Sequence, residues 1–186
     1  MYSGTLGPVH MTVIPKRHAM QIRKERVGDI ERVRRVNESA FDTATEANLV
    51  DALRQQAQPT ISLVADDRGE IVGHIMFSPA VLTGHTDLKI MGLAPMAVLP
   101  DQQRKGIGTK LVLAGLKECE KLNFGAVVVL GHPGYYPRFG FVPSSRFDIN
   151  CEYDVPEDVF MVKELQEGYL RGATGIIKYH GAFSNV

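Results

Sequence analysis

The fold of this chain is decided by the stretch Met96-Ala97-Val98-Leu99-Pro100-Asp101-Gln102-Gln103-Arg104-Lys105-Gly106-Ile107-Gly108. An apolar run ends at a proline, and two closely spaced glycines stand directly before a segment whose apolar residues recur every three or four positions. Glycine lets the backbone approach a ligand closely, and the first amide groups of a helix have no acceptor within it. Because the helix dipole also favours an anion there, the stretch predicts a phosphate-binding turn between a strand and a helix.

The spacing of this turn excludes two well-known phosphate-binding motifs. Gly106 is not followed at the P-loop spacing by a Lys-Ser/Thr pair, and Leu111 occupies the place of the third glycine of the dinucleotide-binding motif. Taken alone, two glycines before a helix are also compatible with a tight turn that binds nothing. A protein for a different phosphate ligand stays open as an alternative at this point.

Hydrophobic periodicity on both sides of the turn predicts a mixed α/β order. Residues 21–27 alternate as a strand, a helix follows the turn and cap at 28–29, and a second helix from 45 ends before Pro59. Residues 61–77 predict a hairpin and 88–98 a third strand, an antiparallel meander. A helix from 108 leads to an apolar strand at 126–130, an order that suggests parallel pairing. We expect 160–165 and 175–179 to pair as closing strands and 143–158 to form a long loop.

Length and composition predict one globular domain. The chain has 186 residues, 44% of them hydrophobic, and its 21 basic residues balance 21 acidic ones, so the formal net charge is zero. A neutral chain lacks the broad attraction that nucleic-acid binders use, which favours a small-molecule or protein substrate and no nucleic-acid partner. Residues 1–19 carry glycines and prolines without periodicity, so we expect a flexible extension before a domain over 20–186.

The cysteine, histidine and hydropathy patterns predict the protein's environment. Two cysteines and six scattered histidines show neither a disulfide framework nor the spacing of metal ligands. No segment approaches the length of an apolar membrane helix, and the first residues lack the apolar core of a signal peptide. We therefore expect a soluble, cytoplasmic protein without metal or membrane partner, either a monomer or a homodimer.

Two motifs together resemble the GCN5-related N-acetyltransferase (GNAT) superfamily. The first is the strand end at 96–100 followed by Gln103-x-x-Gly106-x-Gly108, which is that family's diphosphate-binding signature. The second, Tyr135-Tyr136-Pro137-Arg138-Phe139-Gly140-Phe141, looks like the family's tyrosine-bearing short helix before its sixth strand. The element order over 20–183 also fits. Glu-Ala-x-Leu-Val at 46–50 and Gly-His-Ile at 73–75 are similar to a branch of predicted acetyltransferases whose substrates are poorly defined.

This resemblance implies a fold and a reaction. The fold is a single-domain α/β (α+β) GNAT fold with a mixed, mostly antiparallel twisted sheet of about six to seven strands, splayed at the fourth and fifth strands and flanked by about four helices. The reaction is transfer of an acetyl group from acetyl-CoA to a primary amine of a small molecule, a protein lysine or a protein N-terminus, by direct attack. The alternative is a non-catalytic acyl-CoA-binding regulatory module of the same fold.

The resemblance also implies which residues bind CoA. Backbone groups of Met96, Ala97 and Val98 would pair with the pantetheine and the acetyl carbonyl, and a backbone amide there would stabilise the oxyanion. The diphosphate would lie on the turn formed by Gln103, Arg104, Lys105, Gly106, Ile107, Gly108 and Thr109. Pro95 cannot donate to a strand ladder, so it predicts an edge or a bulge that splays the sheet for cofactor entry.

Tyr136 is the predicted acid that protonates the leaving thiolate, because it stands four residues before Gly140, where the family has its tyrosine. An aromatic ring packed beneath the cofactor is the alternative for Tyr136, and packing is the expected role of Tyr135. His132 is a candidate proton relay, with a loop histidine bonded to backbone as the alternative.

The general base stays open among His132, Glu46, His74 and water, because residues 88–98 contain no carboxylate. Glu46 would also be explained by the helix dipole, and His74 by an ordinary core position. Cys119 fits the apolar stripe of its helix, and no activating partner of Cys151 is identifiable. The acidic loop over 147–160 either attracts a cationic amine or is simply solvated.

Overall fold

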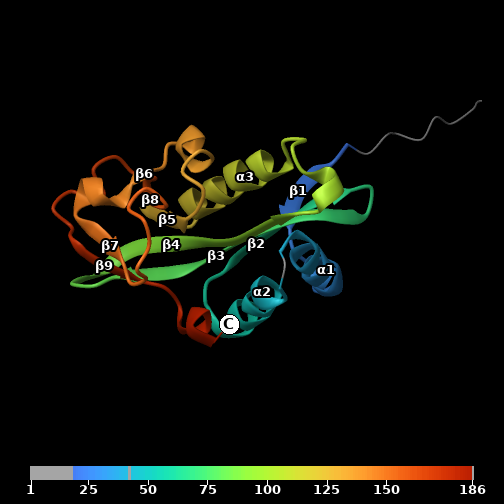
Figure 1. The fold of residues 1–186 in the computed structure, drawn as a ribbon, viewed down its shortest axis with the longest axis horizontal. Coiled ribbons are helices and arrows are strands. Elements are labelled where there is room, and N and C mark those ends of the chain that lie inside the picture. Colours follow the sequence, from blue (N-terminus) through green and yellow to red (C-terminus); the bar gives the residue numbers. More distant parts are fainter. Residues whose placement is uncertain (1–18, 42, 186) are drawn as a thin grey trace, which may run out of the picture.

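A computed structural model describes residues 19–41 and 43–185. Nearly all of the expected N-terminal extension lies outside these residues. Within them, nine strands form one sheet, with α3 on one face and α1 and α2 on the other (Figure 1). The strands are β1 (Gln21–Lys24), β2 (Ile61–Asp67), β3 (Glu70–Leu82), β4 (His85–Val98), β5 (Ala126–Leu130), β6 (Val142–Pro143), β7 (Ile149–Cys151), β8 (Phe160–Glu164) and β9 (Gly175–Lys178).

Three α-helices and several short 3-10 helices complete the described part of the chain. The α-helices are α1 (Ile30–Ala40), α2 (Thr45–Gln56) and α3 (Ile107–Lys121). The 3-10 helices are η1 (Val27–Asp29), η2 (Pro100–Gln102), η3 (Tyr136–Phe139), η4 (Ser144–Phe147) and η5 (Gly181–Asn185). None of the helices in this part of the chain combines the length and the apolar character that crossing a membrane requires.

The hairpin between β2 and β3 forms where the sequence predicts it. Arg68 and Gly69 both have positive φ, 59° and 92°, and the Asp66 carboxylate accepts a hydrogen bond of 2.7 Å from the Gly69 amide. A two-residue turn of this kind matches the twist of the strands it joins. The predicted first strand is shorter than expected, because the Arg26 amide donates to the Asp29 carboxylate at 2.8 Å and the chain turns into η1.

The sheet is forked between β4 and β5, as predicted. These two strands pair in parallel from Ile90 and Ala126 to Leu93 and Val129, after which β4 continues to Val98 without β5 as a partner. The fork begins at a bulge: Ile75 pairs with Met96 and Phe77 with Leu93, so one residue of β3 faces both Ala94 and Pro95. The prediction that Pro95 marks a bulge is confirmed.

The two faces of the sheet bury separate cores. Towards α3, Phe77 and Leu111 are fully buried, and Gly115 of α3 leaves room for the Phe77 ring. Towards α1 and α2, Val33, Leu53 and Met76 are fully buried. The predicted helical stripes on α1, α2 and α3 therefore face the sheet as their 3.6-residue periodicity requires.

Two expectations about the C-terminal third were wrong. The strands β8 and β9 do not pair with each other: β8 lies between β5 and β6, whereas β9 pairs with β3 and β7. The segment 143–158 also contains η4 and β7. Local pattern fails here because the partners of these short strands lie far away in the sequence, as β3 does for β9.

Candidate functional site

A cleft of about 1000 Å³ opens at the fork. Its walls are the free end of β4, the start of α3, the loop that follows β5, and Ala40 and Phe41 at the end of α1. The cleft is lined by nearly all of the residues predicted to bind CoA: Met96, Ala97, Val98, Gln103, Arg104, Gly106, Ile107, Gly108 and Thr109. Lys105 is the exception, because its ammonium group donates to Gln102 Oε1 at 3.1 Å and its side chain does not line the cleft.

The turn before α3 leaves backbone amides free for an anion. Arg104 and Gly106 have φ values of 62° and 80°, which turn the chain sharply into the helix. The first helical hydrogen bond runs from the Lys110 amide to the Gly106 carbonyl, and no side chain caps the Gly106 end. The amides of the first turn therefore have no acceptor in the helix, and that turn carries no acidic residue. This geometry suits a phosphate group.

Gly108 and Gln103 shape this turn in different ways. A Cβ atom on Gly108 would lie 2.8 Å from the Tyr135 hydroxyl and 3.6 Å from Met96 Cε, so only hydrogen fits there without a shift. The Gln103 side-chain amide donates to the Val98 carbonyl at 3.1 Å and ties the turn to the end of β4. The turn and the strand end thus form one rigid wall.

Tyr136 lies on the opposite wall and is buried to 7% exposure. Its ring packs on Gly131, where a Cβ atom would come within 2.2 Å of it, and meets the Tyr135 and Phe141 rings edge-on at 5.1 and 5.6 Å. Burial raises the pKa of the Tyr136 hydroxyl above its ordinary value of 10.0. A phenol that stays protonated at neutral pH can donate a proton into the cleft.

Tyr135 packs edge-on against Tyr136 and Phe139, with ring centroids 5.1 and 5.3 Å apart. It lines the cleft beside Tyr136, and its hydroxyl reaches across to Gly108. The Arg138 guanidinium stacks 4.7 Å above its ring and also donates to the Gly134 carbonyl at 3.3 Å. The sequence analysis did not predict Arg138 as a cleft residue. The signal that could have predicted it is its position, one helical turn after the loop at 131–134.

His132 lines the cleft, but its ring geometry restricts what it can do. The Gly134 amide donates to His132 Nδ1 at 3.1 Å, so the neutral ring carries its proton on Nε2. In that tautomer His132 offers a donor to the cleft and has no free lone pair to accept a proton. His132 therefore both lines the cleft and accepts a backbone hydrogen bond, and in this tautomer it faces the cleft as a donor.

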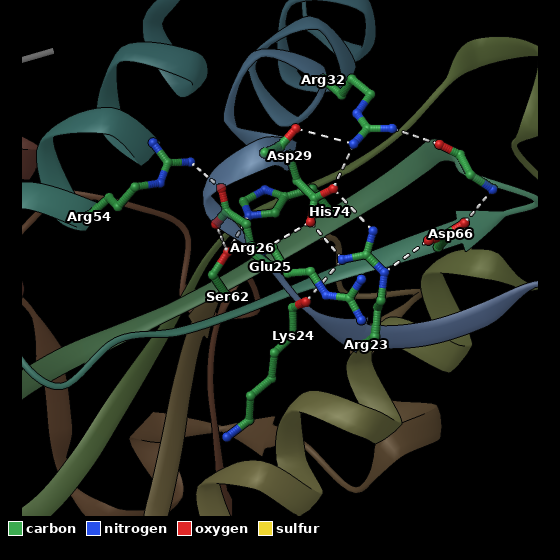
Figure 2. Close-up of polar contacts among 12 residues, drawn as sticks. Arg23, Lys24, Glu25, Arg26, Asp29, Arg32, Arg54, Ser62, Asp66 and His74 are labelled. Atoms are coloured by element: carbon green, nitrogen blue, oxygen red, sulfur yellow. Dashed lines mark hydrogen bonds and ion pairs between the residues drawn. The ribbon is translucent and has the colours of Figure 1, made fainter.

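His74 is not in the cleft but inside the sheet, fully buried (Figure 2). Asn37 Nδ2 donates to His74 Nδ1 at 3.2 Å, and His74 Nε2 lies 2.9 Å from Ser62 Oγ, which in turn donates to the Glu25 carboxylate. Burial, together with the positive charge of Arg54, lowers the pKa of His74 to about 3. A neutral ring with both nitrogens engaged is a structural histidine, the ordinary core position that the sequence also allowed.

The two cysteines are ordinary packing residues. Cys119 is fully buried on α3, as predicted, and burial raises the pKa of its thiol to about 12. Burial also raises the pKa of Cys151, which disfavours a thiolate there. The acidic loop forms a separate hollow of about 610 Å³ beside β7, lined in part by Glu152, Asp154 and Glu157.

Comparison with known proteins identifies the family. Residues 21–143 match the model of the acetyltransferase (GNAT) domain. The chain belongs to the GNAT acetyltransferase family. It is 38% identical over 146 residues to the uncharacterized N-acetyltransferase YhbS of Escherichia coli K12, an alignment that covers 78% of this chain and 87% of YhbS. The uncharacterized N-acetyltransferase YjhQ of the same strain is 38% identical over 134 residues, covering 70% and 74%.

Two solved structures of GNAT acetyltransferases match most of this chain. The crystal structure of Escherichia coli YhbS in complex with CoA has a TM-score of 0.84 at 34% identity and covers 89% of this chain and 92% of that one. A GNAT acetyltransferase from Brucella melitensis in complex with acetyl-CoA has a TM-score of 0.74 at 36% identity, covering 89% and 99%. The GNAT resemblance, the fold class and the assignment as an N-acetyltransferase are therefore confirmed.

Proposed function

We propose that this GNAT enzyme transfers an acetyl group from acetyl-CoA to a primary amine by direct attack. The observation that carries the proposal is the cleft itself, in which the free amides of the α3 first turn stand at one end and the unpaired edge of β4 at the other. The CoA and acetyl-CoA complexes of the two similar structures support the same ligand. The acceptor is the amine of a small molecule, a protein lysine or a protein N-terminus.

The chain's own residues fit CoA along the length of this cleft. The Gly108 position, which a Cβ atom would fill, lets a diphosphate lie against the amides of Ile107, Gly108 and Thr109. Beyond Leu93, the free edge of β4 offers backbone donors and acceptors at 94–98 to the amides of the pantetheine, as an added strand would use them. A backbone amide at this edge also suits the oxyanion that forms during attack.

The reaction requires an ordered removal of protons from the amine. The nitrogen lone pair attacks the acetyl carbon, the carbon–nitrogen bond forms and the carbon–sulfur bond breaks. An ammonium substrate loses two protons in all, of which one ends on the CoA sulfur and the other in solvent. Tyr136, whose raised pKa keeps it protonated, donates to the sulfur, and His132 offers a second donor through Nε2.

Two measurements test this function. Acetyl-CoA and CoA should raise the thermal unfolding midpoint of the full chain, because a ligand that binds only the folded state stabilises it. Thiol release from acetyl-CoA should then depend on added amine across a panel of primary amines. The absence of any stabilisation at millimolar CoA would contradict the assignment of the cleft. Stabilisation without amine-dependent thiol release would favour the acyl-CoA-binding regulatory module instead.

A further inference from the structure

Five buried side-chain polar atoms have no hydrogen-bond partner in the described part of the chain. Two of them, Asn37 Oδ1 and Arg54 Nε, belong to residues in or beside the His74 network. The other three are Glu46 Oε2, Ser78 Oγ and Tyr179 Oη. A buried polar atom without a partner costs stability, so a group of them calls for a ligand that pairs with them.

Ser78 and Tyr179 meet at the closed end of the fork. Ser78 pairs with Gly92 across β3 and β4, and Gly92 stands directly before Leu93, the last β4 residue in register with β5. The Tyr179 ring lies against Gly92, where a Cβ atom would come within 2.8 Å of it. Both hydroxyls therefore lie next to the point where β4 leaves β5.

Glu46 lies on α2, one of the two helices that cover this face of the sheet. It precedes the buried residues Leu49, Val50 and Leu53 at the spacing of one helix face, so its side chain points towards the sheet. Phe183 packs against the cluster that contains Leu49 and Val50, and its ring centroid is 5.0 Å from that of Tyr179. The helix also starts shortly after Phe41, which lines the cleft, and it contacts β4.

We infer that Glu46, Ser78 and Tyr179 bind the acceptor amine beneath the fork, on the sheet face opposite α3. This inference rests on the proposed function, since it supplies the acceptor site of the same reaction. A primary ammonium group carries three N–H donors, and the three residues supply three unpaired buried oxygens. The carboxylate matches the positive charge, which disfavours alcohols as acceptors.

The same arrangement supplies the general base that β4 lacks. Glu46 takes one proton from the ammonium, and the nitrogen lone pair then attacks the acetyl carbon from the α2 side. The carbon–sulfur bond then breaks, Tyr136 gives its proton to the sulfur, and the second proton of the nitrogen passes to the Tyr136 phenolate, which restores the phenol. Glu46 returns its proton to solvent, so that one proton is released in each turnover.

Kinetics of three variants test this site, with spermidine, tyramine and a lysine-containing peptide as acceptors. Tyr179→Phe and Ser78→Ala should each raise the KM of the amine roughly tenfold, the effect of losing one hydrogen bond to a charged group, and leave the KM of acetyl-CoA unchanged. Glu46→Gln should lower kcat/KM for the amine about a hundredfold through loss of the base. An unchanged amine KM in all three variants, with an amine that the wild-type enzyme acetylates, overturns the inference.

Matched controls separate this role from a structural one. The Tyr169 hydroxyl accepts a hydrogen bond of 2.7 Å from the Lys89 amide, so Tyr169→Phe should lower the unfolding midpoint without changing the amine KM. Glu31 stands in the first turn of α1 as Glu46 does in that of α2, so Glu31→Gln controls for the helix dipole. By contrast, Tyr179→Phe and Ser78→Ala remove unpaired hydroxyls and should leave the midpoint equal or higher.

The stability data also decide the case in which no amine is acetylated. Wild-type protein that binds acetyl-CoA but acetylates no member of the panel of primary amines contradicts the proposed transfer to an amine. If Tyr179→Phe and Ser78→Ala then lower the unfolding midpoint as Tyr169→Phe does, the hydroxyls have structural partners and the inference falls. If the two variants are as stable as the wild type or more stable, the hydroxyls are free for a ligand, as inferred.

Discussion

Two groups of polar side chains lie on the α1 and α2 side of this enzyme, and they differ in how completely their polar atoms are paired. Around β1, the Asp29 carboxylate is 2% exposed and accepts hydrogen bonds from Arg23 at 2.6 and 3.0 Å, from Arg32 at 3.0 Å and from the Arg26 amide at 2.8 Å. By contrast, Ser78 and Tyr179 beside Gly92, and Glu46 on α2, each carry a buried oxygen with no partner in the described part of the chain. Paired groups stabilise a fold, whereas unpaired ones lower its stability and are retained where a ligand completes them.

The side chains around Asp29 also connect β1 to β2 and to the helices. Arg23 bridges Asp29 to Asp66 of β2, with its Nε 2.8 Å from that carboxylate. Glu25 directly follows β1, and its carboxylate accepts hydrogen bonds from Arg54 of α2 and Ser62 of β2 (Figure 2). Each of these side chains joins elements that are distant in sequence, so their loss should affect folding and leave the cleft intact.

The largest effect expected is that of Asp29→Ala. This substitution removes a carboxylate that is 2% exposed and takes the main partner from Arg23, whose side chain is 14% exposed and which keeps only Asp66. Breaking such a largely buried ion pair costs about 3 kcal/mol of unfolding free energy. Urea unfolding followed by circular dichroism measures the loss. Asp67→Ala, which removes an exposed ion pair to Arg68 of 3.4 Å, is the control and should change little. An Asp29→Ala protein as stable as the wild type would show that pairing in this cluster carries no stability.

The next effect is a dependence of stability on pH that arises from His74. Its folded-state pKa of about 3 lies below the ordinary 6.5, so between these values the unfolded chain binds a proton that the folded one does not. Stability is therefore fully present above about pH 6.5 and falls as the pH drops, by about 1.4 kcal/mol per pH unit for this group. Arg23 lowers the pKa of Asp29 to about 2, so the stability that this carboxylate contributes is lost only as the pH falls below its ordinary pKa of 3.8.

Chemical unfolding between pH 6.5 and 4.5 isolates the histidine. His74→Asn should be less stable than the wild type at neutral pH but should show a shallower decline of unfolding free energy across this range. An equal slope in the two proteins would mean that His74 does not titrate on unfolding, and that the pH dependence comes from exposed groups.

Much of the fold and of the cleft was predictable from sequence because the signals were local. The two glycines before α3 and the apolar stripes on α1, α2 and α3 each depend on neighbours within a few residues. The parallel pairing of β4 with β5 followed from a strand, helix, strand order. The residues assigned to CoA binding and to acid catalysis nevertheless remain predictions, which only ligand and kinetic data can test.

The features that the sequence did not predict depend on contacts between distant segments, which no local sequence pattern shows. Tyr179 lies against Gly92 and pairs its ring with Phe183, although the sequence offers only a tyrosine after a short strand. For Glu46 the sequence leaves a general base and a dipole-stabilised acid equally open, and only the folded structure shows that its Oε2 is buried and unpaired. Whether a buried polar group is paired is a property of tertiary structure, and the carboxylates differ in this respect: Asp29 is fully paired, whereas Glu46 Oε2 is not.

On the catalytic side, Tyr136→Phe should lower kcat about ten- to a hundredfold while the KM of acetyl-CoA stays unchanged. The effect lies at the low end for an acid catalyst, because a thiolate with a pKa near 8.5 needs little help to leave. Since burial raises the pKa of Tyr136 above 10.0, its ionisation should not limit the wild-type rate up to about pH 9. Steady-state rates from pH 7 to 9 measure both points. An unchanged kcat would assign Tyr136 to packing beneath the cofactor.

The smallest effect expected is that of Gly108→Ala on CoA binding. The new Cβ would lie 2.8 Å from the Tyr135 hydroxyl, at the end of a side chain that can swing away, so the unfolding midpoint should barely change. The methyl group nonetheless occupies the surface against which a diphosphate would lie, and CoA should bind about tenfold more weakly by calorimetry, as for one impaired phosphate contact. Gly115→Ala reverses this pattern: its Cβ would come within 2.2 Å of the buried Phe77 ring, which costs stability by overpacking and leaves the phosphate turn intact. If both alanines lowered stability and neither changed CoA affinity, the turn before α3 would be a structural turn like any other, and the cleft would have to hold its ligand elsewhere.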